Sequence, residues 1–190
     1  MAEIRVQTSG IEDLDGHVEI SIAFLVESVL RPDPEGADLD LVECTVSEPW
    51  WKDYDVEPGA DPAAWLQRFD TSTWSIISAW RGHERLGGVV ILADDPAIDM
   101  LEGRADLGLI WDLRVQPSAR GQGIGRRLID AAEGWATSRG CSTLKVETQN
   151  INVPACRFYE QQGFVLRSVR AHAYPELPHE LQLLWYKQIA

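Results

Sequence analysis

The sequence of 190 residues predicts an α/β fold in a single domain. Short apolar strands follow one another along the chain, and two stretches have the period and the capping residues of helices. At residues 110–125 an apolar strand runs into a glycine-rich loop, and a helix follows. The composition, 45% hydrophobic and 25% charged, is that of a soluble globular protein with one sizeable core.

The first third of the chain is the harder part to assign. Residues 4–7 predict a strand, whereas residues 11–26 fit either an alternating strand or one face of a helix. Residues 31–63 are rich in proline and acidic residues, which predicts an irregular surface segment. Asp61 followed by Pro62 predicts the start of a helix, with Asp61 as its N-cap.

The remaining elements follow clearer signals. We expect strands at residues 73–80, 86–93, 107–115, 144–148, 164–170 and 181–188, and helices at 123–139 and 152–163. One face of the first helix carries Ile124, Leu128, Ala131, Ala132 and Trp135. Gly140 ends this helix, and Asn152 with Pro154 begins the second one.

The loop before the first helix has an unusual charge. From Leu113 to Ile129 there are four arginines and no acidic residue, in a chain whose net charge is −13. The N–H groups at a helix N-terminus favour an anion, so a basic glycine loop there predicts an anion site. Arg126 and Arg127 have the wrong sign for the helix dipole, which suits a multiply charged phosphate ligand.

A dinucleotide-binding loop would give the same order of strand, glycine loop and helix, and Glu147 stands where its acidic residue is expected. The glycine spacing does not fit. Counted from Gly121 the last glycine falls on Arg126, and counted from Gly123 it falls on Leu128. A GxxxxGK[ST] phosphate loop is also absent, so the nucleotide interpretation is disfavoured.

Two motifs resemble the GNAT acetyltransferase superfamily. Its R/Q-x-x-G-x-G/A loop is matched by Arg120, Gly123 and Gly125, and its second signature by Asn152, Ala155, Tyr159, Gly163 and Phe164. Within the superfamily, residues 147–156 and 184–187 most resemble the streptothricin-type acetyltransferases. The resemblance covers about 105–190, the expected coenzyme-binding half, and leaves 1–104 as a variable acceptor-binding half of one domain.

The resemblance implies a mixed, mostly antiparallel central sheet, splayed in the middle, with helices on both faces and acetyl-CoA as co-substrate. The residues it assigns to the coenzyme are Leu113, Arg114, Val115, Arg120, Gly121, Gln122, Gly123, Ile124, Gly125, Arg126, Asn152 and Tyr159. Glycines let the backbone approach a phosphate closely, which agrees with this assignment. Each arginine could equally be a solvated surface cation.

The same resemblance implies catalytic roles. Tyr159 would protonate or hydrogen-bond the departing thiolate, or would simply pack in its helix. Asn152 could cap its helix, touch the coenzyme, or do both, and the Leu113 N–H would stabilise the oxyanion. The general base would be Asp112 or Glu147, unless these carboxylates pair with Arg114 and Lys145.

We expect a small cationic amine as acceptor, because the chain is acidic and carries aromatic residues beside acids. The candidate acceptor residues are Trp50, Trp51, Tyr54, Asp53, Asp55, Glu57, Asp70, His172, Tyr174 and Glu176, whereas Trp65 and Trp74 are expected to pack in the core. The acceptor would be a streptothricin-like antibiotic, which would make the protein a resistance enzyme. The alternatives are a protein or peptide N-acetyltransferase and a non-catalytic acyl-CoA sensor.

Other expectations concern partners and location. A pI near 4.6 argues against nucleic acid, and the sequence shows neither a membrane span nor a signal peptide. Three cysteines without metal-ligand spacing fit a reducing cytoplasm and predict no metal site. Tryptophans near residue 50 could instead anchor a homodimer.

Overall fold

The computed structural model describes residues 3–37, 39–57 and 62–189. It divides into two compact units, between which the chain passes several times. The first unit holds residues 1–22, 53–144 and 188–190, and the second holds residues 23–52 and 145–187. The prediction of a single domain at 1–190, with an acceptor-binding half at about 1–104 and a coenzyme-binding half at about 105–190, stays a prediction.

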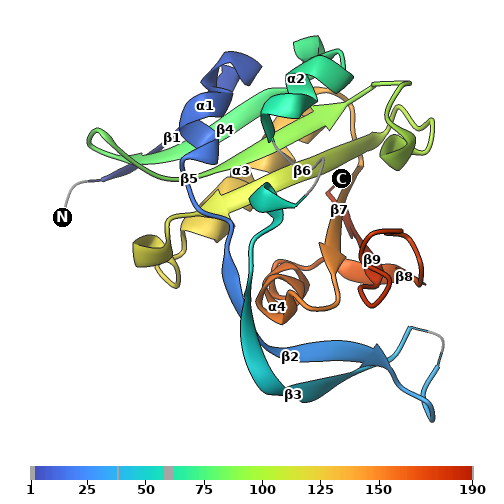
Figure 1. Cartoon of the computed structure of the whole chain (residues 1–190). Coiled ribbons are helices and arrows are strands. Elements are labelled where there is room, and N and C mark those ends of the chain that lie inside the picture. Colours follow the sequence, from blue (N-terminus) through green and yellow to red (C-terminus); the bar gives the residue numbers. More distant parts are fainter. Residues whose placement is uncertain (1–2, 38, 58–61, 190) are drawn as a thin grey trace. The chain divides into compact units, whose positions relative to one another are not determined.

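The first unit is built on four antiparallel strands in the order β1-β4-β5-β6 (Figure 1). These strands are β1 (Ile4–Gly10), β4 (Ser75–Arg81), β5 (Glu84–Ala93) and β6 (Leu107–Val115). The predicted strand at residues 107–115 is confirmed, as are those at 4–7 and 86–93 within longer strands. Gly82, at a φ of +61°, makes the turn between β4 and β5.

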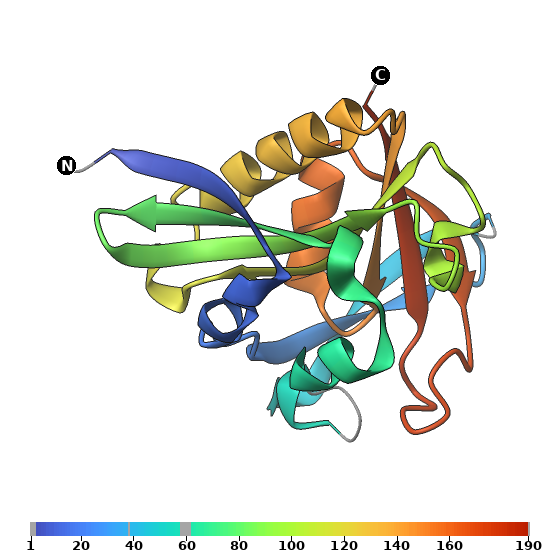
Figure 2. The ribbon, with the colours of Figure 1, turned by 90° about the horizontal axis from the view of Figure 1, so that it is seen from above.

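Helices cover both faces of this sheet. Figures 1 and 2 show α3 (Ile124–Ser138) on one face, and α1 (Leu14–Val18) and α2 (Trp65–Arg68) on the other. Among its described residues the unit also has six short 3₁₀ turns: Ile11–Asp13, Tyr54–Val56, Pro62–Ala64, Thr71–Thr73, Asp99–Leu101 and Pro117–Ala119. A helix does begin near the expected start at Pro62, but its predicted cap, Asp61, lies outside the described residues.

The apolar face of α3 packs on the sheet as its period predicts. Its buried residues are Ile124, Leu128, Ile129, Ala132, Trp135 and Ala136, and Ala131 is half-buried. The helix approaches β6 closely at Gly108, where a Cβ would lie 3.0 Å from Leu144 and 3.3 Å from Ala136. The N-terminal end of α3 is equally close to β5, since a Cβ at Gly87 would lie 3.2 Å from both Ile124 and Leu128, and this packing fixes the glycine loop relative to the sheet.

The second unit has strands in the order β7-β9-β8, one helix and a hairpin. These elements are β7 (Thr143–Gln149), β8 (Val165–Arg170), β9 (Gln182–Gln188), α4 (Val153–Gln161), and a hairpin of β2 (Phe24–Pro32) and β3 (Leu41–Lys52). Asn152 caps α4 by accepting a hydrogen bond from the Ala155 N–H at 3.2 Å, as predicted. Arg157 on α4 pairs with Glu43 on β3.

The hairpin of β2 and β3 contradicts part of the prediction for residues 31–63 and resolves the two alternatives for residues 11–26. Within residues 31–63, which were predicted to be irregular, residues 41–52 form β3 and most of them pair with β2, so the prediction is wrong for this part. The ladder is interrupted opposite Glu27, and residues 46–49 bulge out there, so Pro49 stands where no ladder hydrogen bond is required. The ambiguous stretch 11–26 divides into the short helix α1 and the start of β2.

None of the helices within the described ranges is long and apolar enough to cross a membrane.

Candidate functional site

The glycine loop joins β6 to α3 in the first unit. Gly121 and Gly123 have φ values of +73° and +78°, which only glycine adopts without strain. Gly123 is the N-cap of α3 and offers no side chain, and the first turn contains no acidic residue. The first N–H groups of a helix have no partner within it, so this terminus presents backbone donors to an anion.

Side chains brace the same loop. Arg120 is exposed, and its guanidinium donates to the Val115 carbonyl at 3.2 Å and to the Ser21 carbonyl at 3.3 Å. Gln122 donates to the Ser118 carbonyl at 2.8 Å and accepts from Arg81 at 3.0 Å. Arg81, at the end of β4, adds a cation to the loop that the sequence analysis missed.

Four buried or partly buried side chains, His17, Asp55, Asp112 and Arg114, form what we call the ion network. The Arg114 guanidinium donates to both oxygens of Asp112, at 2.9 and 3.0 Å, and to both oxygens of Asp55, at 2.6 and 2.8 Å. Nε2 of His17 donates to Oδ1 of Asp112 at 2.8 Å, since a carboxylate only accepts. The network links β6 to α1 and to the turn at Tyr54–Val56.

Electrostatics fix the charge states in this network. Burial by itself would raise the pKa of Asp112, but the hydrogen bond and charge of His17 and the charge of Arg114 lower it to about 2. Burial opposes the charge of Arg114 too, yet the two carboxylates raise its pKa above the usual value. Arg114 is 2% exposed, so its side chain belongs to the ion network, and only its backbone remains a candidate for the coenzyme.

A glycine makes room for the histidine. His17 is fully buried, and its Nδ1 has no hydrogen-bond partner among the described residues. A Cβ at Gly88 on β5 would lie 2.5 Å from that nitrogen. The absence of a side chain at position 88 therefore allows the imidazole to reach Asp112.

A β-bulge precedes the ion network on β6. Val90 pairs with Asp112 and Ile91 with Ile110, so Trp111 between them has no partner on β5. A bulge re-aims the side chains that follow it. After the bulge Asp112 and Arg114 are buried and Leu113 and Val115 are half-buried, in alternation. The expected backbone contacts of Leu113 and Val115 with the coenzyme remain predictions.

In the second unit, four side chains form what we call the Glu147 cluster: Glu147, Gln149, Tyr174 and Gln182. Oε1 of Glu147 accepts from the Tyr174 hydroxyl at 2.5 Å and from Gln149 at 3.4 Å, and Oε2 accepts from Gln182 at 2.6 Å. Gln149 also donates to the Tyr174 hydroxyl at 3.1 Å. Burial, followed by the charge of Glu147, raises the pKa of Tyr174 well above 10. These three donors to Glu147 are a phenol and two amides, all of them neutral.

The remaining candidates of the second unit lie on α4. Tyr159 is 6% exposed, and its ring packs edge-on against Phe158 and Phe164, with centroids 5.2 and 5.4 Å away. Cys156 contacts Thr148 at 3.3 Å, and burial raises the pKa of its thiol to about 11, which makes it a poor nucleophile.

The aromatic candidates divide by exposure. Trp65 and Trp74 are buried, as predicted, and pack with Phe69 and Trp111 in one cluster. Trp50 and Trp51 on β3 are 41% and 72% exposed.

The acidic and late-loop candidates also separate. Asp53 and Asp70 accept from backbone N–H groups and cap short turns, whereas Asp55 is held by Arg114. Tyr174 belongs to the Glu147 cluster, and His172 and Glu176 are exposed.

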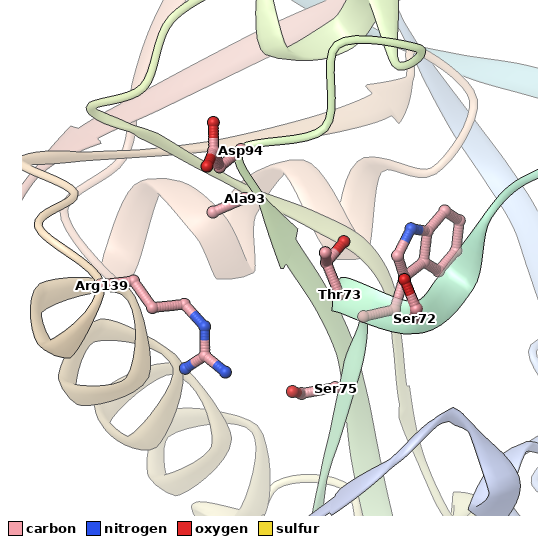
Figure 3. Close-up of a pocket in the computed structure, with 7 residues that line it drawn as sticks. Ser72, Thr73, Ser75, Ala93, Asp94 and Arg139 are labelled. Carbon is pink, nitrogen blue, oxygen red and sulfur yellow. The ribbon is translucent and has the colours of Figure 1, made fainter.

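A cavity of about 340 Å³ lies elsewhere in the first unit, between the start of β4, the end of β5 and the residue after α3 (Figure 3). It is lined by Ser72, Thr73, Trp74, Ser75, Ala93, Asp94 and Arg139. Because α3 separates Arg139 from the glycine loop by its 15 residues, roughly 22 Å, this cavity is not the anion site of the loop. Among the described residues, no cluster of three His, Cys, Asp or Glu side chains could hold a metal ion.

Comparison with known proteins identifies the relatives of the chain. The family model for the acetyltransferase (GNAT) family matches residues 41–164. Streptothricin acetyltransferase from Escherichia coli is 37% identical over 84 residues, which cover 43% of this chain and 48% of that protein. The streptothricin acetyltransferase of Streptomyces lavendulae is 29% identical over 154 residues, 81% of this chain and 74% of that protein. The chain thus spans about half the length of the Escherichia coli protein.

A solved structure agrees with these sequences. A crystal structure from Bacillus anthracis str. Ames, in complex with acetyl coenzyme A, superposes with a TM-score of 0.77 and 25% identity. The superposition covers 98% of this chain and 98% of that one. The predicted α/β fold with a mixed, mostly antiparallel sheet is thereby confirmed.

Proposed function

Because this chain belongs to the acetyltransferase (GNAT) family, we propose that it transfers the acetyl group of acetyl-CoA to a primary amine of a small cationic acceptor of the streptothricin kind. The observation that carries the proposal is the glycine loop before α3, with its positive φ angles, exposed arginines and backbone donors. The relatives named streptothricin acetyltransferases supply the acceptor class.

The residues of the loop suit the diphosphate of acetyl-CoA. Backbone N–H groups from Gly121 to Arg126 would hold it, since the glycines leave the backbone open to close approach. Arg120 and Arg126, both exposed, would add charge-assisted hydrogen bonds, with Arg81 in support. The backbone of residues 113–115 would pair with the pantetheine arm, and Asn152 would contact the coenzyme besides capping α4.

We assign the general base to Glu147 rather than Asp112. A base must accept the proton of the acceptor's ammonium, and a carboxylate whose pKa is held near 2 by cationic partners accepts one poorly. Glu147 is partly exposed at the end of β7, and its donors are neutral, so its negative charge is free to attract an ammonium group.

The reaction then balances as follows. The ammonium gives one proton to Glu147, and the neutral nitrogen attacks the thioester carbonyl, whose oxyanion the Leu113 N–H stabilises. The C–N bond forms as the C–S bond breaks, and Tyr159 supplies a proton to the departing thiolate. The second proton of the attacking nitrogen leaves as the amide forms and restores the Tyr159 phenol, so the products are the amide, the free thiol and one proton held by Glu147. A phenol is protonated at neutral pH and can act as this donor.

The reaction is tested by acetyl-CoA-dependent release of free thiol across streptothricin, aminoglycosides, polyamines, free lysine and short peptides. We expect turnover with a cationic small amine. Turnover on neutral peptide N-termini alone would replace the proposal by a protein N-acetyltransferase. Binding of acetyl-CoA without turnover on any amine would indicate a sensor.

The loop assignment has a matched pair of variants. Gly121 and Gly103 both have positive φ values, +73° and +66°, and a Cβ on either meets nothing within 4 Å. Gly121→Ala and Gly103→Ala therefore impose similar backbone strain at two places in the same unit. Calorimetry should show acetyl-CoA binding weakened tenfold or more by Gly121→Ala only. Equal effects of both variants would remove the loop from the coenzyme site.

A further inference from the structure

We propose that Tyr174 is a positioning residue, which, with Gln182, holds the Glu147 carboxylate in the orientation that accepts the acceptor's proton. The inference rests on the proposed function, because it concerns the base of that reaction. The sequence placed Tyr174 only among residues that could line an acceptor site.

Each oxygen of the Glu147 carboxylate accepts one short hydrogen bond. Tyr174 donates to Oε1 at 2.5 Å and Gln182 donates to Oε2 at 2.6 Å, so each oxygen is fixed from a different element. A carboxylate has about four lone-pair sites. Because Gln149 also donates to Oε1 at 3.4 Å, Oε1 accepts two hydrogen bonds and Oε2 only one among the contacts described above, so Oε2 keeps more lone-pair capacity for a proton from an ammonium.

The segment that carries Tyr174 is anchored in the second unit. Asn150, 4% exposed, accepts from the Leu181 N–H at 2.7 Å through its side chain and donates its own N–H to the Leu181 carbonyl at 3.1 Å. Glu180 pairs with Lys52 at 3.1 Å, and both side chains are buried. Because its C-terminal end is fixed in this way, the segment can hold the Tyr174 hydroxyl against β7.

Charges around Tyr174 keep it a donor. The ionisable groups that face it are Glu147 from β7 and Glu180 from its own segment, with Lys52 of β3 paired to Glu180. Burial and the two negative charges favour the neutral phenol, so Tyr174 donates throughout the working pH range and does not itself accept the proton. Lys145, two residues before Glu147 on β7, lies instead against the Tyr186 ring, with its Nζ 5.3 Å from the centroid.

Tyr174→Phe removes only the hydroxyl and is compared with Tyr186→Phe on β9. A carboxylate that loses a hydrogen-bond donor holds its proton more strongly. We therefore expect Tyr174→Phe to move the acidic limb of the kcat/KM profile upward by about one pH unit and to lower kcat about 10- to 100-fold. Affinity for acetyl-CoA should not change, and Tyr186→Phe should keep the wild-type profile.

Gln182→Met serves as a second variant, because it removes the donor to Oε2 and leaves Tyr174 in place. It should move the same limb in the same direction, and thermal unfolding of each variant checks that the fold is retained. An active wild-type enzyme whose profile neither variant moves would overturn the role of Tyr174 alone. A wild-type protein inactive on every amine would overturn the proposed function, and this inference with it.

Discussion

The ion network and the Glu147 cluster are both built around a carboxylate on a strand, yet their partners differ in kind. Asp112 receives its hydrogen bonds from a guanidinium and an imidazole and is 9% exposed. Glu147 receives its hydrogen bonds from a phenol and two amides and is partly exposed. Cationic partners stabilise the ionised carboxylate and so lower its pKa, which makes it a poor proton acceptor. Neutral donors orient a carboxylate without neutralising its charge, which can then attract an ammonium group.

The difference shows that the role of an acidic residue on a strand, as a general base or as part of an ion pair, follows from its hydrogen-bond partners rather than from its position in the sequence. In the sequence Asp112 and Glu147 were equal candidates for the base, each with a basic residue two positions away. The structure pairs Asp112 with Arg114, whereas Glu147 accepts from Tyr174 and Gln182, and Lys145 lies against the Tyr186 ring. This comparison predicts opposite consequences for changes in the two regions.

The largest effect is expected from Glu147→Gln. Losing a general base costs about 10²- to 10⁴-fold in kcat/KM. The amide keeps the shape of the side chain, so unfolding by urea should change little. Glu160→Gln, on the exposed side of α4, is the matched control and should keep full activity. Wild-type turnover by Glu147→Gln would return Asp112 to consideration.

Arg114→Met should act on stability. It leaves Asp112 buried without its guanidinium partner, which costs about 3–5 kcal/mol in the free energy of unfolding. Urea denaturation measures this loss. A loss in the free energy of unfolding below about 1 kcal/mol would mean that the ion network contributes little to stability, and would contradict a structural role for Asp112.

Gly88→Ala tests the histidine side of the ion network. The added Cβ would lie 2.5 Å from Nδ1 of His17, and overpacking of this kind costs about 1–3 kcal/mol. Gly134→Ala is the opposite case, because it adds a Cβ in open space on α3 and should stabilise the helix by up to about 1 kcal/mol. Chemical denaturation of both variants should show the two opposite signs.

Acid should weaken the ion network by a smaller amount. The pKa of Asp112 is lowered from 3.8 to about 2, so its stabilisation is complete above about pH 4 and is lost as the pH falls through 2. The difference between wild type and Asp112→Asn should therefore shrink by up to about 2 kcal/mol over that range. Arg104 and Ser142 also lower the pKa of Asp106 to about 2. Asp106 is present in both proteins, so its contribution to the pH dependence cancels in the difference between them. A difference independent of pH would contradict the assignment.

Local patterns predicted the elements that shape the glycine loop. The period of apolar residues gave α3 and β6, and Asn152 with Pro154 gave the start of α4. The hairpin of β2 and β3 was missed because Pro49 and its acidic neighbours are typical of loops. Its ladder tolerates them only because residues 46–49 bulge out.

The partners of the two carboxylates were beyond sequence reasoning for a different cause. His17 and Asp55 lie 95 and 57 residues from Asp112, and no periodicity connects positions so far apart. Tyr174 is 27 residues from Glu147 in a segment without helix or strand. Of these contacts, the sequence indicated only the pair of Asp112 with Arg114, two residues apart on one strand, as the alternative to a base role for Asp112.

The bulge at Trp111 gives the first unit an optical signature of its own. The Trp111 ring lies 4.9 Å from that of Trp74 and 6.1 Å from that of Trp65, with interplanar angles of 51° and 83°. Indoles held so close and so strongly tilted couple their electronic transitions, which gives a near-ultraviolet circular dichroism band that depends on fixed packing. That band reports whether the strand before Asp112 is in place, without any label and without turnover.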